Sequence, residues 1–120
     1  MAAYPAGIIG NTAANLKAAA DGEKFEWSKL YQEFADIATQ EGFTEAFETF
    51  TQIAKVEKYH EERYRALLEN VEQGNVFKKG TTVQWHCRNC GFVAEGKEAP
   101  AKCPACKHPQ AYFQVRSQNY

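Results

Sequence analysis

The chain has 120 residues and a formal net charge of −1, which is enough for one domain or two small ones. A nearly neutral chain gives no electrostatic reason to expect nucleic acid or an anionic membrane as a partner. Its apolar runs are far shorter than the roughly 20 residues of a membrane span, and no basic segment precedes the mild apolar stretch near the start. We therefore expect a soluble, cytoplasmic protein.

The first predicted element is an extended N-terminal arm over residues 1–10, where proline and glycine disfavour a helix. Either Asn11 or Thr12 can cap a helix that begins there. Small and apolar residues then recur at spacings of three, four and seven, which describe one helical face, and Gly42 is placed to end the helix. The residues of this face are Leu16, Ala19, Ala20, Leu30, Phe34, Ile37 and Ala38.

A second helix is predicted from Thr44, a good N-cap residue, to Gly74. Its apolar face contains Phe47, Phe50, Ala54, Tyr64, Leu67, Leu68 and Val71. Because the connection between the two helices is so short, they must form an antiparallel hairpin, which we place at residues 11–75. Each helix has about 30 residues and is therefore roughly 45 Å long.

Both helical faces also carry side chains that are rarely buried without a partner. Glu23 and Glu26 fill a gap in the first face, and Glu57 and His60 continue the second face at the same height of the hairpin. Since no lysine or arginine shares these faces nearby, metal ions are the simplest source of compensating charge. Glutamates combined with a Glu-x-x-His motif are typical of di-iron bundles and suit iron or manganese.

The alternative for each helix alone is a solvated surface, because Glu-x-x-His also occurs on exposed helices. Agreement in face, height and ligand type between two helices favours the metal site. Glu61 also points roughly inward, and we expect it to support a ligand rather than bind the metal. Tyr31, Tyr59 and Tyr64 are expected to pack or to donate hydrogen bonds.

From residue 76 onward the sequence predicts a small β domain over residues 76–120. Gly80, Gly91 and Gly96, with three prolines, predict turns between the strands, and residues 116–120 are expected to form a loose tail. A domain of about 40 residues is too small to fold on apolar burial alone, so it needs a structural metal. The predicted β segments are 76–77, 83–85, 92–93 and 111–115.

Four cysteines lie in this domain as two Cys-x-x-Cys pairs. Disulfides of secreted proteins join distant loops, so paired cysteines at a short spacing predict a metal site instead. Four thiolates form a tetrahedral site for iron or zinc, and the spacing alone does not choose. Gly91 and Pro104 fit a rubredoxin-type iron site, and a zinc ribbon is the alternative. The four cysteines are Cys87, Cys90, Cys103 and Cys106.

Together these motifs resemble the rubrerythrin family. The resemblance covers nearly the whole chain and rests on Gly10-Asn-Thr-Ala-Ala-Asn-Leu, Gly-Glu23-Lys-Phe-Glu26-Trp, Val-Glu57-Lys-Tyr-His60-Glu and the cysteine run from 87 to 109. It implies a ferritin-like di-iron bundle followed by a rubredoxin-like domain with one iron per chain. It also implies a peroxidase in which electrons pass from the sulfur site to the di-iron site, with Glu26 as a mobile ligand.

The chain departs from that family because a rubrerythrin bundle has four helices and this chain predicts two. It resembles the C-terminal half of the bundle plus the rubredoxin-like domain, and its hairpin leaves a long apolar face uncovered. We therefore predict a homodimer in which two hairpins complete the four-helix bundle around a di-iron centre shared between chains. The alternative is a fragment, or a half that pairs with a different polypeptide.

Three functions follow from these readings. A non-haem iron peroxidase would reduce hydrogen peroxide with electrons from a donor protein or reductase. A ferroxidase or iron-handling protein would use oxygen as the oxidant. An electron carrier, or a zinc-bound structural relic, would need only the four-cysteine site. The sequence does not identify the electron donor.

Overall fold

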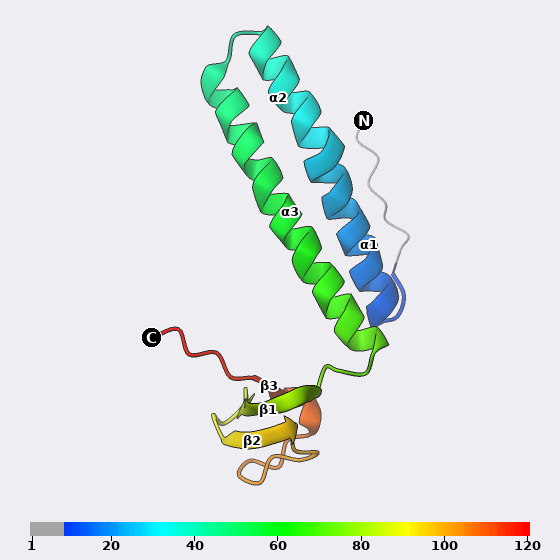
Figure 1. Ribbon diagram of the computed structural model, residues 1–120, viewed down its shortest axis with the longest axis vertical. Helices are drawn as coiled ribbons and strands as arrows, with labels where there is room; N and C mark the ends of the chain where they lie inside the picture. The colour runs from blue at the N-terminus through cyan, green and yellow to red at the C-terminus, as the bar shows by residue number, and fades with distance from the viewer. Residues whose placement is uncertain (1–8) are drawn as a thin grey trace. The chain divides into compact units, whose positions relative to one another are not determined.

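The computed structural model describes residues 9–120, so most of the arm expected over residues 1–10 lies outside the described part. The chain divides into two compact units, Met1–Glu72 and Gln73–Tyr120, whereas the sequence placed the division near residue 75. Figure 1 shows that the first unit is a helical hairpin and the second a small three-stranded sheet. The predicted fold, a helical hairpin followed by a small β unit, is confirmed. None of the described helices is long and apolar enough to cross a lipid bilayer.

The first arm of the hairpin consists of α1 (Thr12–Phe25), η1 (Glu26–Leu30) and α2 (Tyr31–Gln40). Of the two predicted caps the structure selects Asn11, whose side-chain oxygen accepts a hydrogen bond of 2.9 Å from the Ala14 amide. The sequence predicts one regular helix over this arm. The structure corrects that expectation, because η1 is a π-helical segment.

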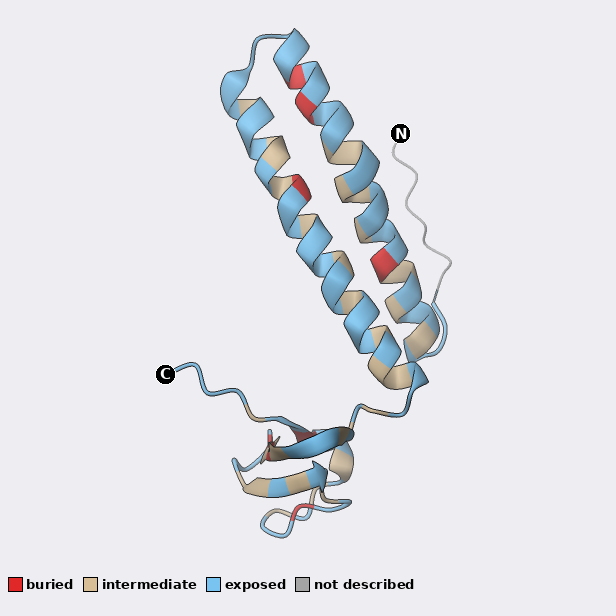
Figure 2. Cartoon of the chain, in the orientation of Figure 1, coloured by how far each residue is buried: buried red, intermediate tan, exposed pale blue. Residues whose placement is uncertain are grey.

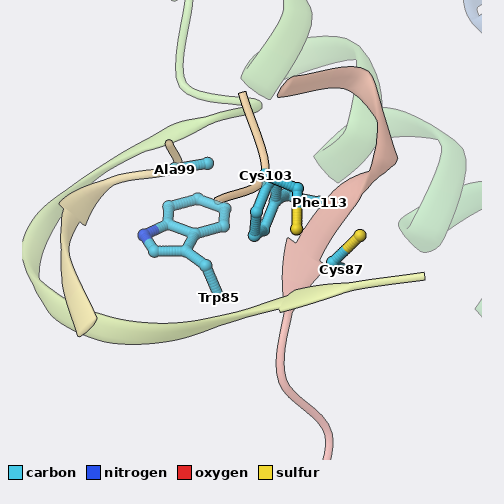
Figure 3. Close-up of a cluster of buried hydrophobic side chains, with 5 residues drawn as sticks. All are labelled: Trp85, Cys87, Ala99, Cys103 and Phe113. Atoms are coloured by element: carbon cyan, nitrogen blue, oxygen red, sulfur yellow. The ribbon is translucent and has the colours of Figure 1, made fainter. Parts of the chain in front are cut away.

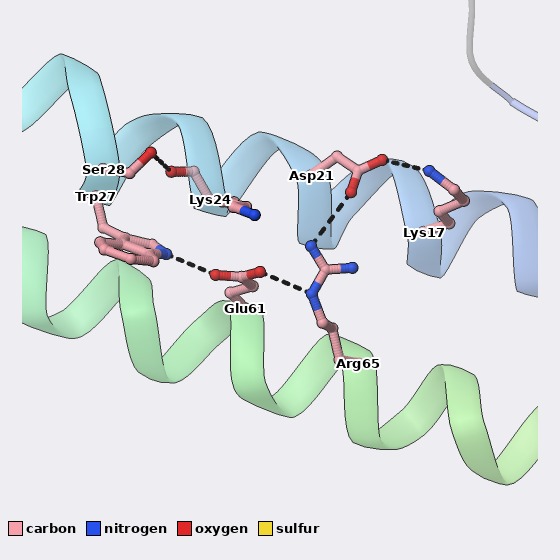
Figure 4. Close-up of polar contacts among 7 residues, drawn as sticks. All are labelled: Lys17, Asp21, Lys24, Trp27, Ser28, Glu61 and Arg65. Carbon is pink, nitrogen blue, oxygen red and sulfur yellow. Dashed lines mark hydrogen bonds and ion pairs between the residues drawn. The ribbon is translucent and has the colours of Figure 1, made fainter.

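The π-helical segment adds one residue to a turn of the helix. The Tyr31 amide donates to the Glu26 carbonyl, five residues back, where an α-helix would use the residue four back. In Figure 4 the Ser28 hydroxyl donates to the Lys24 carbonyl within the same stretch. Such segments are frequent at functional sites, and this one begins at Glu26, one of the predicted ligands.

The turn that joins the two arms is a Schellman motif. Gly42 adopts a φ of 77°, its amide donates to the Thr39 carbonyl at 3.2 Å, and the Phe43 amide donates to the Ala38 carbonyl at 2.8 Å. The left-handed conformation is one that glycine adopts without a steric penalty. The predicted role of Gly42 as the helix stop is therefore confirmed.

The second arm is a single helix, α3 (Thr44–Glu72), followed by Gly74 with a φ of 68°. The Phe47 amide donates to the Phe43 carbonyl at 3.0 Å, so the helical hydrogen bonds begin at Phe43. The prediction that Thr44 is the N-cap residue is thus wrong by one position, because Thr44 already lies inside the first turn.

All the fully buried residues of the described hairpin are alanines, which form a seam between the two arms. Larger apolar side chains flank this seam and stay partly open, with 37% of Phe34 and 50% of Ile37 exposed. Figure 2 shows how little of either arm is buried. The hairpin therefore carries an uncovered apolar face, as the sequence predicts. The seam residues are Ala20, Ala35, Ala38 and Ala54.

The second unit is an antiparallel sheet with strand order β2-β1-β3. Strand β1 covers Lys78–Cys87, β2 covers Val93–Glu98 and β3 covers Phe113–Val115. A 3-10 turn, η2 (Gln110–Tyr112), precedes β3.

Three details of this sheet differ from the sequence prediction. Gly80 and Gly96 lie inside strands β1 and β2, where the sequence predicts turns. A register shift between Lys78 and Val83 accommodates the irregular pairing near Gly80. The segments 76–77 and 92 precede their strands, and residues 111–112 belong to the 3-10 turn. The tail is tied at its start, since the Arg116 amide donates to the Gln84 carbonyl at 2.8 Å.

The core of the sheet unit contains two of the predicted metal ligands. Trp85, Cys87 and Cys103 have no exposed surface, and Ala99 and Phe113 are 3% exposed (Figure 3). The indole nitrogen of Trp85 donates to the Gly96 carbonyl at 3.0 Å, so the largest side chain of the core has no unpaired polar atom. The core and the sulfur cluster of this unit are therefore one structure.

Two candidate metal centres

The hairpin brings three of its four predicted ligands together. Glu23 comes from α1, while Glu57 and His60 come from α3, and their ligand atoms all lie within 4.8 Å of one another. His60 Nδ1 is 2.7 Å from Glu57 Oε2 and 3.5 Å from Glu23 Oε1. Two oxygen ligands and one nitrogen ligand thus face the same point between the helices.

The burial of this cluster is uneven. The side chains of Glu23 and Glu57 are 17% and 14% exposed, whereas His60 is 47% exposed. Glu23 Oε2 is buried and accepts no hydrogen bond from the described residues. A buried carboxylate oxygen without a donor is costly, and a bound cation would satisfy it. The donor set and the orphaned oxygen both fit a metal ion.

The electrostatics of the cluster also favour a cation. Burial raises the pKa of Glu23, and the nearby Glu57 carboxylate raises it further, against an opposing effect of His60. Glu23 and Glu57 therefore repel each other when both are ionised, and a cation between them would relieve that repulsion.

Glu26 lies outside the three-residue cluster. It is the first residue of η1 and is partly buried. The negative charge of Glu26 nevertheless acts on the site, because it helps to raise the pKa values of Glu23 and Tyr31. Glu26 therefore borders the candidate centre in this arrangement of the helices.

Tyr31 closes one side of the same region. Its ring contacts Phe34 and Phe50, with centroid distances of 6.0 Å and 6.2 Å. Burial and the charges of Glu26, Glu57 and Glu23 raise the pKa of Tyr31, so its phenol stays protonated. Tyr31 packs as the sequence predicts and also keeps a hydroxyl donor near the carboxylates.

A polar network lies beside the cluster and was not foreseen from the sequence (Figure 4). Trp27 Nε1 donates to Glu61 Oε2 at 2.6 Å, Arg65 Nε donates to Glu61 Oε1 at 2.7 Å, and Arg65 also reaches Asp21 at 3.2 Å. Glu61, which the sequence predicts to support a metal ligand, makes its hydrogen bonds to Trp27 and Arg65 in the described part of the chain. The available signal was Trp27 itself, whose indole N–H needs an acceptor once it turns inward.

The hydrogen bonds of this network lower the pKa values of its two carboxylic acids, Glu61 and Asp21. Burial acts to raise the pKa of Glu61, but the hydrogen bonds from Trp27 and Arg65 outweigh it and hold the pKa below 4.5. Hydrogen bonds from Lys17 and Arg65 likewise lower the pKa of Asp21. Both carboxylates thus stay ionised and cross-link the two arms.

The four cysteines converge in the sheet unit. The Sγ atoms of Cys87 and Cys106 are 3.7 Å apart, those of Cys90 and Cys103 are 3.6 Å apart, and all four are free thiols. A tetrahedral ion with bonds of about 2.3 Å holds its sulfur ligands about 3.8 Å apart. The cluster therefore has the dimensions of a single four-coordinate metal.

Two turns, which we call the knuckles (residues 87–91 and 103–107), present these sulfurs. The Gly91 amide donates to the Cys87 carbonyl at 2.8 Å, and the Lys107 amide donates to the Cys103 carbonyl at 3.0 Å. The last residue of each knuckle is left-handed, with φ values of 84° for Gly91 and 68° for Lys107. The knuckles are therefore close equivalents.

The two cysteines nearer the surface have pKa values that are shifted in opposite directions. The backbone amide of His108 is the main reason that the pKa of Cys106 falls to about 5. The Phe92 amide acts the same way on Cys90, but burial and the neighbouring cysteines outweigh it and raise the pKa of Cys90 to about 11. Four thiolates this close require a multivalent cation, which iron and zinc both supply.

Comparison with known proteins assigns both units of the chain to one family. The family model for rubrerythrin matches residues 1–68, and the model for the rubredoxin-like domain of rubrerythrin matches residues 85–114. The chain belongs to the rubrerythrin family. The family predicted from the sequence motifs is thereby confirmed.

Individual rubrerythrins match almost all of the chain. It is 57% identical to rubrerythrin of Porphyromonas gingivalis, over 99% of this chain and 60% of the relative, and 54% identical to rubrerythrin of Clostridium perfringens, over 99% and 61%. The solved structure of fully reduced, all-ferrous nigerythrin is 30% identical with a TM-score of 0.52, covering 96% of this chain and 53% of that one. The chain thus spans about 60% of the length of these rubrerythrins.

Proposed function

We propose that this chain is a subunit of a non-haem iron peroxidase that reduces hydrogen peroxide to water. Each peroxide molecule takes up two electrons and two protons and yields two water molecules. The observation that carries the proposal is the convergence of Glu23, Glu57 and His60 in a chain that also gathers four cysteines. Iron held at both places would supply one-electron redox changes, and we assign the role of electron entry to the four-cysteine site.

Iron is favoured over zinc by the relatives. Nigerythrin has been solved in partially reduced and in all-ferrous states, so its metal centres change oxidation state. In this chain Cys87, Cys90, Cys103 and Cys106 would hold one iron. Glu23, Glu57 and His60 would hold the helical iron, and we propose that Glu26, which borders this cluster, joins them when the metal is bound.

Other residues of the hairpin would control access and protons. Tyr31, Phe34 and Phe50 form an aromatic cluster, which would limit the access of water to the carboxylates from that side. Because its pKa is raised, the Tyr31 phenol remains available as a hydrogen-bond or proton donor near the site.

The helical centre also needs a second hairpin, and we propose that a second copy of the chain supplies it. One chain leaves His60 half exposed and an apolar face open beside the alanine seam. An isologous two-fold contact would cover both faces with the same surface and pool two sets of ligands, enough for two irons.

Metal analysis combined with peroxide assays tests this function. Protein loaded with ferrous iron without oxygen should bind about one iron per chain at the cysteines and one more in the helices. Glu57→Ala should lower peroxide turnover by about 100-fold or more and lose the helical iron, while the visible colour of the sulfur site is kept. Glu62→Ala, an exposed neighbour on α3, is the matched control and should behave like the parent.

Two outcomes would contradict the proposal. Turnover by Glu57→Ala at the parental rate would show that peroxide is not reduced at the helical centre. Oxygen consumption coupled to iron release, without peroxide turnover, would indicate a ferroxidase. Sedimentation of the iron-loaded protein tests the assembly, since a monomer that binds iron only at its cysteines would exclude the shared centre.

A further inference from the structure

The two units of the chain carry opposite charge, which the net charge of −1 conceals. The sheet unit, Gln73–Tyr120, contains seven lysines and arginines but only two acidic residues, Glu95 and Glu98. The hairpin unit contains thirteen acidic and seven basic residues. The unit with the four-cysteine site is therefore strongly basic.

The two acids of the sheet unit lie on β2, away from the sulfur turns. Glu98 is paired in register with Lys78, and Glu95 accepts a hydrogen bond of 2.9 Å from the Gln84 side chain. The knuckles themselves contain Arg88 and Lys107 and no acidic residue. The positive charge near the sulfurs thus has no acidic neighbour within those turns.

The sulfur cluster reaches the surface on one edge, which we call the cysteine edge and define by Cys90 and Cys106. Cys90 is exposed and Cys106 partly so, while Cys87 and Cys103 are buried. An electron from another protein has its shortest path through an exposed ligand. Arg88 precedes Cys90 by two residues and Lys107 follows Cys106 directly. The Arg88 guanidinium donates to the Ala111 carbonyl at 3.2 Å, so its position in the first knuckle is fixed by the segment before β3.

Lys107 occupies this edge in a strained conformation. Its φ of 68° matches that of Gly91 in the other knuckle, but a side chain makes this conformation unfavourable. Its ammonium group donates to the Pro104 carbonyl at 2.6 Å, which holds the charge over the second knuckle. Glycine would form the same turn without strain but would carry no charge at this position.

A hollow of about 210 Å³ lies beside the first knuckle and adds a third cation to the same unit. Gly91 and His86 line it together with Arg116, whose guanidinium is held by Gln84 Oε1 and by the Tyr120 hydroxyl, each at 2.9 Å. A fixed guanidinium in a recess suits an incoming carboxylate.

We propose that the cysteine edge, with Arg88, Lys107 and the Arg116 hollow, is the docking face for an acidic one-electron carrier protein. The proposal rests on the proposed function, because it gives that function its electron donor. In each encounter the donor loses one electron and the four-cysteine site gains it, with no bond or proton transferred. Two encounters supply the two electrons that one peroxide needs.

Docking is tested without peroxide, so the result does not depend on turnover at the helices. Flavodoxin serves as an acidic carrier and cytochrome c as a basic control. With zinc-loaded protein, oxidised flavodoxin should shift backbone NMR signals of the knuckles, and cytochrome c should not. With iron-loaded protein, reduced flavodoxin should reduce the sulfur site at a rate that falls steeply with added salt.

Matched variants separate this face from the general charge of the unit. Combined Arg88→Gln and Lys107→Gln should lower the association rate by about ten-fold and flatten its salt dependence. Lys97→Gln removes the same kind of charge from β2 and should change the rate less than about two-fold. Lys107→Gly should slow docking while raising the thermal midpoint of the unit, because it removes the charge and the strain together.

Equal losses from Lys97→Gln and Lys107→Gln would overturn the proposal, since net charge alone would then explain binding. NMR shifts confined to residues outside the knuckles, or no binding of flavodoxin at low salt, would overturn it as well. Failure of peroxide turnover with normal docking would instead count against the proposed function.

Discussion

Cys87 and Cys103 are completely buried inside the sheet unit, whereas His60, on the hairpin, leaves nearly half of its side chain exposed. The difference follows from how the ligands are supplied. Four cysteines within twenty residues can be gathered by two local turns and covered by a small three-stranded sheet. Ligands on long helices need a wider surface to cover them, and this hairpin leaves His60 partly open. A metal site can thus be complete or incomplete according to the range of its contacts.

Metal removal should separate the two regions by the largest effect. Because its sulfurs are core residues, the sheet unit should unfold when a chelator strips the metal, while the hairpin keeps its helices. In a Trp27→Phe background the emission of Trp85, the remaining tryptophan, should shift to the red, with the far-UV helical signal retained. Adding zinc should restore it. Emission from Trp85 that stays blue-shifted without metal would show that the unit folds on apolar burial alone.

Overpacking the alanine seam should have the next largest effect and should be confined to the hairpin. Ala54 is 4% exposed, and Ala54→Leu would force the two arms apart. Such a change costs about 1–3 kcal/mol of unfolding free energy. Ala66→Leu, on an exposed position of α3, is the control and should change it by less than about 0.5 kcal/mol. Urea denaturation followed by circular dichroism measures both, and equal effects would mean that the seam is not closely packed.

The Arg65 network should give the smallest effect, with a defined pH dependence. The pKa values of Glu61 and Asp21 are lowered from their ordinary values of 4.5 and 3.8. The stabilisation that these ionised carboxylates provide is therefore fully present above those pH values. It is lost as the pH falls through the lowered pKa values. Arg65→Met should therefore lower the free energy of unfolding slightly at pH 7 and progressively less below pH 4, because these carboxylates lose their charge there.

Urea unfolding of the metal-free protein at pH 7 and pH 3 measures this difference, with Arg63→Met as the exposed control. A cost of Arg65→Met that is the same at both pH values would show that Arg65 acts through packing of its aliphatic stem rather than through its charge.

Periodicity and motif spacing were sufficient for the hairpin, for Gly42 as the helix stop and for the pairing of the cysteines. These features depend on local contacts or on a repeated pattern. The π-helical segment was not predicted, because Glu26–Leu30 contains no proline or glycine that would mark a break in the helix. Its extra residue also leaves the spacing of the apolar residues almost unchanged. The contact between Trp27 and Glu61 joins residues 34 positions apart and has no local signature. Gly80 and Gly96 were misplaced because tertiary pairing overrode their turn preference.

Alanines that meet along a seam are nearly interchangeable, so they do little to stop one helix from sliding past the other by a turn of 5.4 Å. The hydrogen bonds that cross the hairpin, Trp27 to Glu61 and Arg65 to Asp21, oppose such a slide. The rings of Tyr31 and Phe34, which contact Phe50 on the other arm, oppose it as well. The axial register of the hairpin, and with it the height at which Glu23 meets Glu57, is therefore fixed by side chains that bind no metal. Substitutions in these hydrogen-bonded pairs would therefore change the relative height of Glu23 and Glu57, although every metal ligand would still be present in the sequence.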